Sequence, residues 1–133
     1  MGMYTEIFVS TRVMTGSPAV PVLSYMCEKG DLPNELPNHA FFYSARWKWL
    51  LRSSSYYFVP RSIQLFEYDK IGNYWVLIAL SSLKNYNGEV EKFFDWLDPL
   101  LDLVNGEMIG YSRYEEDNSP IIWYKGASSI TKL

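Results

Sequence analysis

Apolar, β-forming residues gather in short runs along the chain, and polar residues, glycine or proline bound each run, a pattern that predicts strands. Lys70-Ile71-Gly72-Asn73 separates two of these runs, and Asp117-Asn118-Ser119-Pro120 separates another two. Both tetrapeptides have the composition of tight turns, so we expect two hairpins. The expected strands cover 4–10, 55–59, 62–69, 74–82, 108–114 and 121–124.

Two segments instead place apolar residues at helical spacing. The first follows Ser17, and Pro21 favours a helix start near Ala19 because a proline further in removes a backbone hydrogen bond. The second covers 89–98 and is expected to end or kink at Pro99. The remaining segments are a Pro/Asn-rich loop over 31–39 and a short helix or turn over 44–52.

This order of elements predicts an α+β fold. Hairpin-linked strands interrupted by two helices indicate an antiparallel sheet of about five to six strands, with the two main helices on one face. A ferredoxin-like variant is the leading topology. We expect a single domain over 1–125 and a flexible C-terminal tail over 126–133.

Composition narrows the class of protein. The chain has 133 residues, of which 48% are apolar and 17% aromatic, values that exclude a disordered protein. One cysteine and one histidine are too few for a disulfide framework or a structural zinc site, so we expect no cofactor. A net charge of −3 argues against direct binding of nucleic acid. No membrane span or signal peptide is recognisable, which favours the cytoplasm.

Negative charge concentrates in the second half of the chain, where residues 67–133 hold eleven acids against six bases. Glu91, Asp95, Asp98 and Asp102 are spaced by four, three and four positions, so on a helix they share one face. Glu115-Glu116-Asp117 adds acids at a hairpin tip. One reading is an ordinary solvated face, and the other is an acidic patch that binds a partner with a basic surface.

A second cluster interleaves cations with aromatic rings. Arginine beside tryptophan or tyrosine can hold an anion while a ring stacks on a base, which suggests a site for a nucleotide-like or other anionic small molecule. The competing reading places the rings in the core with the cations turned outward. The candidate ligand-binding residues are Arg46, Trp47, Trp49, Arg52, Ser54, Tyr56, Tyr57 and Arg61.

Catalytic residues are sparse, and we do not expect an enzyme. His39 lies in the Pro/Asn loop and is read as an exposed loop histidine, with a hydrolase base as the alternative. Cys27 lies on the apolar stripe of the first helix, where an unassisted thiol is a poor nucleophile. The chain has no P-loop, dinucleotide-binding or nucleophile-elbow motif.

The segments 4–9, 46–58, 84–86, 94–99 and 109–117 together resemble small uncharacterised proteins of phages and prophages. That resemblance implies an accessory protein, acting in the host cytoplasm, that binds and blocks a host defence factor such as a restriction or CRISPR component. The leading hypothesis is therefore a non-catalytic inhibitor with an acidic binding surface, and capture of an anionic small molecule is the alternative. Exposed aromatic residues also make a homodimer a hypothesis.

Overall fold

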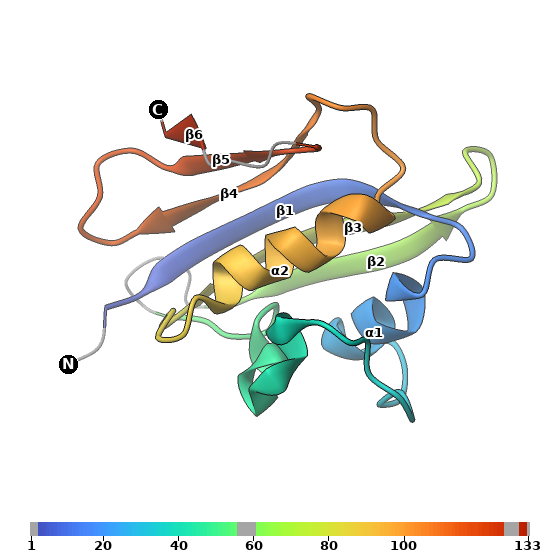
Figure 1. Cartoon of the computed structure of the whole chain (residues 1–133), viewed down its shortest axis with the longest axis horizontal. Coiled ribbons are helices and arrows are strands. Elements are labelled where there is room, and N and C mark those ends of the chain that lie inside the picture. The colour runs from blue at the N-terminus through green and yellow to red at the C-terminus, as the bar shows by residue number, and fades with distance from the viewer. Residues whose placement is uncertain (1–2, 56–60, 127–130, 133) are drawn as a thin grey trace.

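The computed structural model describes residues 3–55, 61–126 and 131–132. Figure 1 shows their arrangement, with α2 lying across β1 and β3. The elements in chain order are β1 (Thr5–Met14), α1 (Ala19–Met26), η1 (Ala40–Tyr43), η2 (Ala45–Trp49), β2 (Ile63–Asp69), β3 (Tyr74–Leu83), α2 (Glu89–Leu97), η3 (Asp98–Leu100), β4 (Met108–Tyr114), β5 (Ile121–Tyr124) and β6 (Thr131–Lys132).

The strands of the described residues form one antiparallel sheet in the order β2-β3-β1-β4-β5-β6. The predicted α+β class is confirmed. The segment that contains α1 joins β1 to β2 with β3 between them, and α2 joins β3 to β4 with β1 between them. Each unit is thus a split βαβ arrangement, whereas the ferredoxin-like assignment itself stays a prediction.

The helices cover one face of the sheet. Along β1, side chains alternate strictly between that buried face and the opposite, more exposed face. Ile7, Val9 and Val13 have no exposed surface, whereas Phe8 between them is half-buried and Ser10 is exposed. The buried side joins the apolar sides of α1 and α2 in one core cluster. Burying such a stripe is the main driving force for folding, at roughly 25 cal/mol per Å² of apolar surface. The far side of the sheet carries no helix among the described residues.

Most predicted elements are present where the sequence places them. α1 starts at Ala19, whose N–H donates to the Ser17 hydroxyl at 3.1 Å, and α2 ends at Leu97. Pro99 then lies in η3, a single tight turn, so the predicted helix end is confirmed. Both predicted hairpins, β2–β3 and β4–β5, are also confirmed.

Other segments differ from expectation or cannot be compared. The short helix or turn expected over 44–52 is present as η2, a 3-10 helix followed by a turn, whereas η1 was not predicted. Of the expected strand 55–59, residues 56–59 lie outside the described residues. Within the expected tail, Thr131–Lys132 pair with β5 as β6. No helix among the described residues is long and apolar enough to cross a membrane.

Candidate functional site

The four acids with helical spacing do not form one helical stripe. α2 ends at Leu97, so only Glu91 and Asp95 lie on it, while Asp98 begins η3 and Asp102 follows η3. The expectation of a single acidic helix face is therefore corrected, because Pro99 redirects the chain before the stripe is complete.

Several of these acids already contact groups of the same chain. Glu91 accepts from the Asn85 side-chain amide at 2.9 Å, and the Asp95 carboxylate lies 2.9 Å from the ring of His39. Asp98 is half-buried and pairs with Lys125 at 3.2 Å. Asp95 keeps 79% of its side chain exposed, so its contact with His39 leaves it available to solvent.

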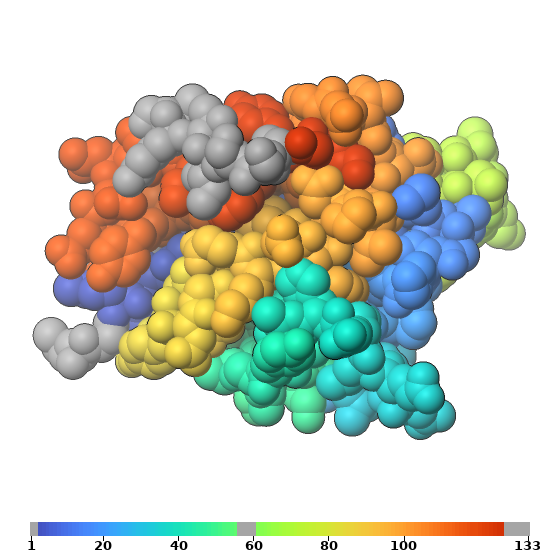
Figure 2. All heavy atoms as spheres, in the orientation of Figure 1, coloured from blue at the N-terminus to red at the C-terminus, as the bar shows by residue number. Residues whose placement is uncertain are grey.

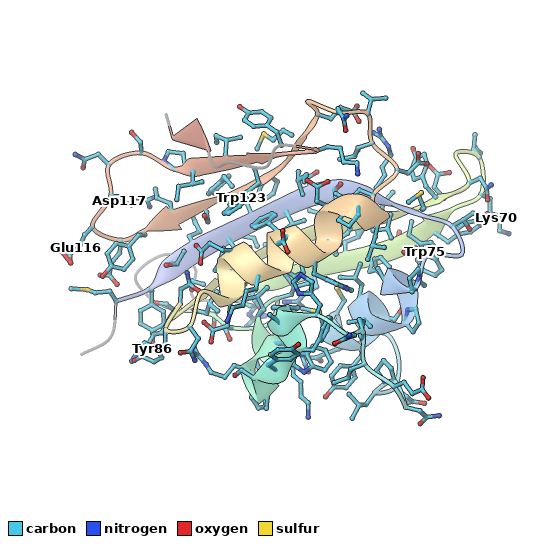
Figure 3. The ribbon with its side chains drawn as sticks, viewed as in Figure 1. Lys70, Trp75, Tyr86, Glu116, Asp117 and Trp123 are labelled. Atoms are coloured by element: carbon cyan, nitrogen blue, oxygen red, sulfur yellow. The ribbon has the colours of Figure 1, made fainter. Side chains whose placement is uncertain are left out.

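The hairpin-tip acids lie together at one end of the molecule, in the β4–β5 turn (Figure 3). Glu115 accepts the backbone N–H of Tyr4, which fixes the start of the turn against β1. Partial burial, followed by the Glu116, Glu115 and Asp117 carboxylates, raises the pKa of Tyr114 at the end of β4. The tip is therefore a region of negative potential.

A cleft of about 410 Å³ opens beside this tip. It lies on the helix side of the sheet, between the start of α2 and the β4–β5 hairpin. In Figure 2 these are the yellow and red-orange surfaces at the same end of the molecule. The lining residues come from three distant parts of the chain, and they are Met3, Thr5, Asn85, Tyr86, Glu91, Ser112, Tyr114 and Ile121.

The chemistry of this end cleft is acidic and aromatic. Glu91 is the one carboxylic acid side chain among the described lining residues, and none of those residues is lysine, arginine or histidine. Tyr86 is 66% exposed, and Figure 3 shows it near the same end of the molecule as Glu116. The guanidinium of Arg46 lies 5.0 Å from the Tyr86 ring centre and orients that ring. Such a cleft suits a cation attached to an apolar stem.

The start of α2 is built so that Glu91 points toward the cleft. Gly88 precedes the helix with φ of +69°, a left-handed conformation that glycine adopts without strain. Asn85 accepts the N–H of Val90 at 3.1 Å and donates to Glu91, so one side chain both caps the helix and holds the carboxylate.

The structure disperses the predicted anion-binding cluster. Trp47 is buried in the core, and Arg46 pairs with the buried carboxylate of Glu89 at 2.6 Å. Arg52 donates to the Lys48 carbonyl and pairs with Glu28 at 3.3 Å. Trp49, Ser54 and Arg61 are exposed, whereas Tyr56 and Tyr57 lie outside the described residues.

His39 and Cys27 have structural surroundings. The His39 Nδ1 atom accepts the N–H of Phe41 at 3.0 Å, so Nε2 carries the proton that it donates to Asp95. Neither ring nitrogen is then free to act as a base. Burial raises the pKa of the Cys27 thiol to about 12. No group of three or more potential metal ligands occurs in the part of the chain that the structure describes.

Comparison of the chain with protein-family models, with curated proteins and with solved structures gives no match. The resemblance to small phage and prophage proteins accordingly stays a prediction. Function has to be inferred from the geometry of the chain itself.

Sequence reasoning selected Glu91 and the hairpin tip but missed the rest of the cleft. Nothing in the sequence around Tyr86 and Tyr114 indicates a binding site beyond their aromatic rings. Thr5 and Ser112 have the pattern of ordinary strand residues. Their proximity follows from the pairing of β1 with β4, which no local pattern specifies.

Proposed function

We propose that the chain is a non-catalytic binding protein that holds a basic segment of a partner protein in the end cleft. One observation carries the proposal: the Glu91 carboxylate and the exposed Tyr86 ring line a cleft of about 410 Å³ whose described lining residues include no base. This volume falls in the usual range for binding sites, roughly 300–1,000 Å³.

A lysine or arginine side chain matches this lining along its whole length. Its alkyl stem would lie against Met3 and Ile121, and its cation would reach Glu91 and the ring of Tyr114, since Arg46 already lies over the Tyr86 ring. A cation over an aromatic face contributes about 0.5–2 kcal/mol, the larger value applying where water is excluded. A hydrogen bond to a charged group adds roughly 1.5–3 kcal/mol.

The acidic hairpin tip would act at longer range. Glu116 is exposed beside the cleft, and partial burial, followed by the tip carboxylates, raises the pKa of Tyr114. Charges at the rim of an interface mainly accelerate association and make it sensitive to salt. Asp95, on α2, and Asp102, after η3, are both exposed, and their charges extend the attraction for a basic surface.

The resemblance to phage proteins makes the partner a host protein in this proposal. Occupying a basic surface that the host protein needs for another ligand would block it without any chemical step. A basic surface is what a nucleic-acid-binding defence protein presents, so the acidic cleft fits such a target.

The test is an NMR titration with short peptides that contain arginine or lysine, beside acidic peptides of the same length. We expect the basic peptides to shift the amide resonances of Glu91, Tyr86 and Tyr114, and the acidic peptides to leave them unchanged. Glu91→Gln preserves the acceptor for Asn85 and removes the charge, so it should weaken binding about tenfold.

Glu35→Gln is the matched control, because it removes one exposed carboxylate in the 31–39 loop, away from the cleft lining. It should leave the affinity unchanged. If both variants weakened peptide binding equally, the loss would follow from net charge alone, and the end cleft would not be the binding site. Resonance shifts confined to another surface would overturn it as well.

A further inference from the structure

The sheet face opposite α2 carries an apolar row that crosses five strands. Pairing in the sheet places Ile63 opposite Leu80, Leu80 opposite Phe8, Phe8 opposite Tyr111 and Tyr111 opposite Ile122. Directly opposed residues point to the same face, so these side chains form one continuous line. We call this line, together with the neighbouring Leu65, Ile78 and Val76, the open-face row.

Most of these side chains are partly exposed, whereas Ile122 at the β5 end of the row is buried, with 8% of its surface exposed. None of them belongs to the core cluster or to the partly buried residues packed against it. Ile63 is 55% exposed, and Phe8 and Leu80 are half-buried although no described helix covers them. Antiparallel sheets with one solvated face normally place polar residues there. A contiguous apolar surface on a sheet is typical of an interaction site.

Tyr111 fits the row because it remains neutral. Its ring lies 5.5 Å from that of Phe8, and its hydroxyl donates to the Glu6 carboxylate at 3.1 Å. Burial, followed by the Glu6 charge, raises the pKa of Tyr111 to about 12. The Tyr111 ring therefore continues the row from Phe8, while its hydroxyl is bonded to Glu6.

The charges that border the row are of both signs. Glu6 lies opposite Arg113, with 4.0 Å between their charged atoms, on one side of the row. On the other side, Glu67 and Arg12 flank Val76 in the same register. A second copy therefore meets no excess of like charge on this face. This distinguishes the face from the end cleft, which favours a basic partner.

The size of the face also suits a second copy. The whole face of these five strands, with its charged border included, spans roughly 550 Å², taking strands ~4.8 Å apart and about seven residues at ~3.3 Å each. A standard interface buries about 800 Å² per partner, and smaller ones belong to weak, reversible complexes.

We propose that two copies of the chain associate through their open-face rows, with the two sheets packed face to face about 10 Å apart. The dimer is reversible, with a dissociation constant on the order of micromolar. Because the end cleft lies on the helix side of the sheet, its failure as a binding site would leave this dimer unaffected.

Sedimentation velocity over a range of concentrations tests the proposal. The wild-type chain should shift from monomer to dimer in the micromolar range. Leu80→Lys places a charge in the middle of the row and should raise the dissociation constant at least about tenfold. Ile71→Lys is the matched control: Ile71 is 99% exposed in the β2–β3 turn, so the same change there should leave the dimer intact.

A second measurement needs no variant. In a mixture of isotope-labelled and unlabelled wild-type chains, intermolecular NOEs should connect the Phe8 and Tyr111 rings to the methyl groups of Leu80 and Ile78. A wild-type chain that stays monomeric at every concentration overturns the proposal. So does a dimer that Leu80→Lys leaves unchanged, or a monomer that binds neutral phosphatidylcholine vesicles through these residues.

Discussion

The ion pair between Arg46 and Glu89 gives Arg46 a structural role. The Glu89 side chain is only 3% exposed, and its carboxylate lies 2.6 Å from the Arg46 guanidinium. The same carboxylate accepts the N–H of Asn87, while Arg46 also donates to the carbonyl of Lys84. A buried carboxylate without such partners would be strongly destabilising. Arg46 thus fastens η2 to the start of α2 and is occupied by that contact.

The ionisation of Cys27 is linked to folding, because its thiol is buried in the folded chain. Burial is the main cause that raises its thiol pKa from 9.0 to about 12, and Lys29 and Arg52 oppose the rise only partly. Because the unfolded thiol ionises first, raising the pH above about 9 stabilises the unfolded chain, and this loss continues until the folded thiol ionises. Stability is therefore unaffected by Cys27 below that range and falls within it.

We predict that Cys27→Ala removes this part of the alkaline destabilisation. Between about pH 8 and about pH 10.5 the wild-type chain should lose about 2 kcal/mol more unfolding free energy than the variant, at 1.36 kcal/mol for each unit. Urea unfolding at the two pH values measures the difference. A constant offset between wild type and variant at both pH values would contradict the prediction.

At the scale of elements, β1 and β4 approach unusually closely at Gly110. A Cβ atom there would lie 2.0 Å from the Phe8 carbonyl oxygen, and the register of β4 with β5 shifts between Met108 and Gly110. Because the obstacle is backbone in the middle of the sheet, it cannot move aside as a flexible side chain would. Glycine is required by this close approach of two strands.

We predict that Gly110→Ala destabilises the chain by about 1–3 kcal/mol, the usual cost of overpacking. Urea unfolding monitored by circular dichroism would show it. Gly16→Ala is the comparison, because Gly16 has positive φ but nothing within 4 Å, so only backbone strain of about 1–2 kcal/mol is added. If Gly110→Ala lowered the unfolding free energy by less than Gly16→Ala does, the prediction would be wrong, because β1 and β4 would then separate freely to admit a methyl group.

Elements with a local signature could be predicted from the sequence, and those without one could not. The β2–β3 hairpin follows from its alternation and turn residues, and α2 from its apolar stripe ending at Pro99. η1 is stabilised by Trp96, on which Phe41 stacks and which Phe42 meets edge-on, contacts across more than fifty residues of chain. The bulge at Gly110 and the pairing of β6 likewise depend on tertiary neighbours.

At the scale of the whole molecule, two candidate surfaces lie on opposite faces of one sheet. Thr5 and Ser112 face the end cleft, while Phe8 and Tyr111 on the same two strands face the other way. The acidic residues could be singled out from the sequence because charge spacing is local. The open-face row could not be, because its continuity depends on the strand order and on the register of four strand pairs.

Opposite placement of the two surfaces makes the proposed dimer divalent. Face-to-face packing of the sheets turns the two end clefts outward, separated by at least ~30 Å when each copy adds a helix layer of about 10 Å to the ~10 Å between sheets. Two basic peptides joined by a flexible linker of about 40–80 residues can span that distance, since such linkers reach roughly 35–50 Å.

We predict that the tethered peptide pair binds the wild-type chain at dimer-forming concentrations at least about tenfold more tightly than the single peptide. The gain arises because the second peptide binds at a high effective concentration once the first is held. Isothermal titration calorimetry with Leu80→Lys is the control: it keeps the end cleft, so single-peptide affinity should be unchanged while the tethering gain disappears. An equal gain in both proteins would mean that tethering acts within one chain, and the two clefts would not belong to a common assembly.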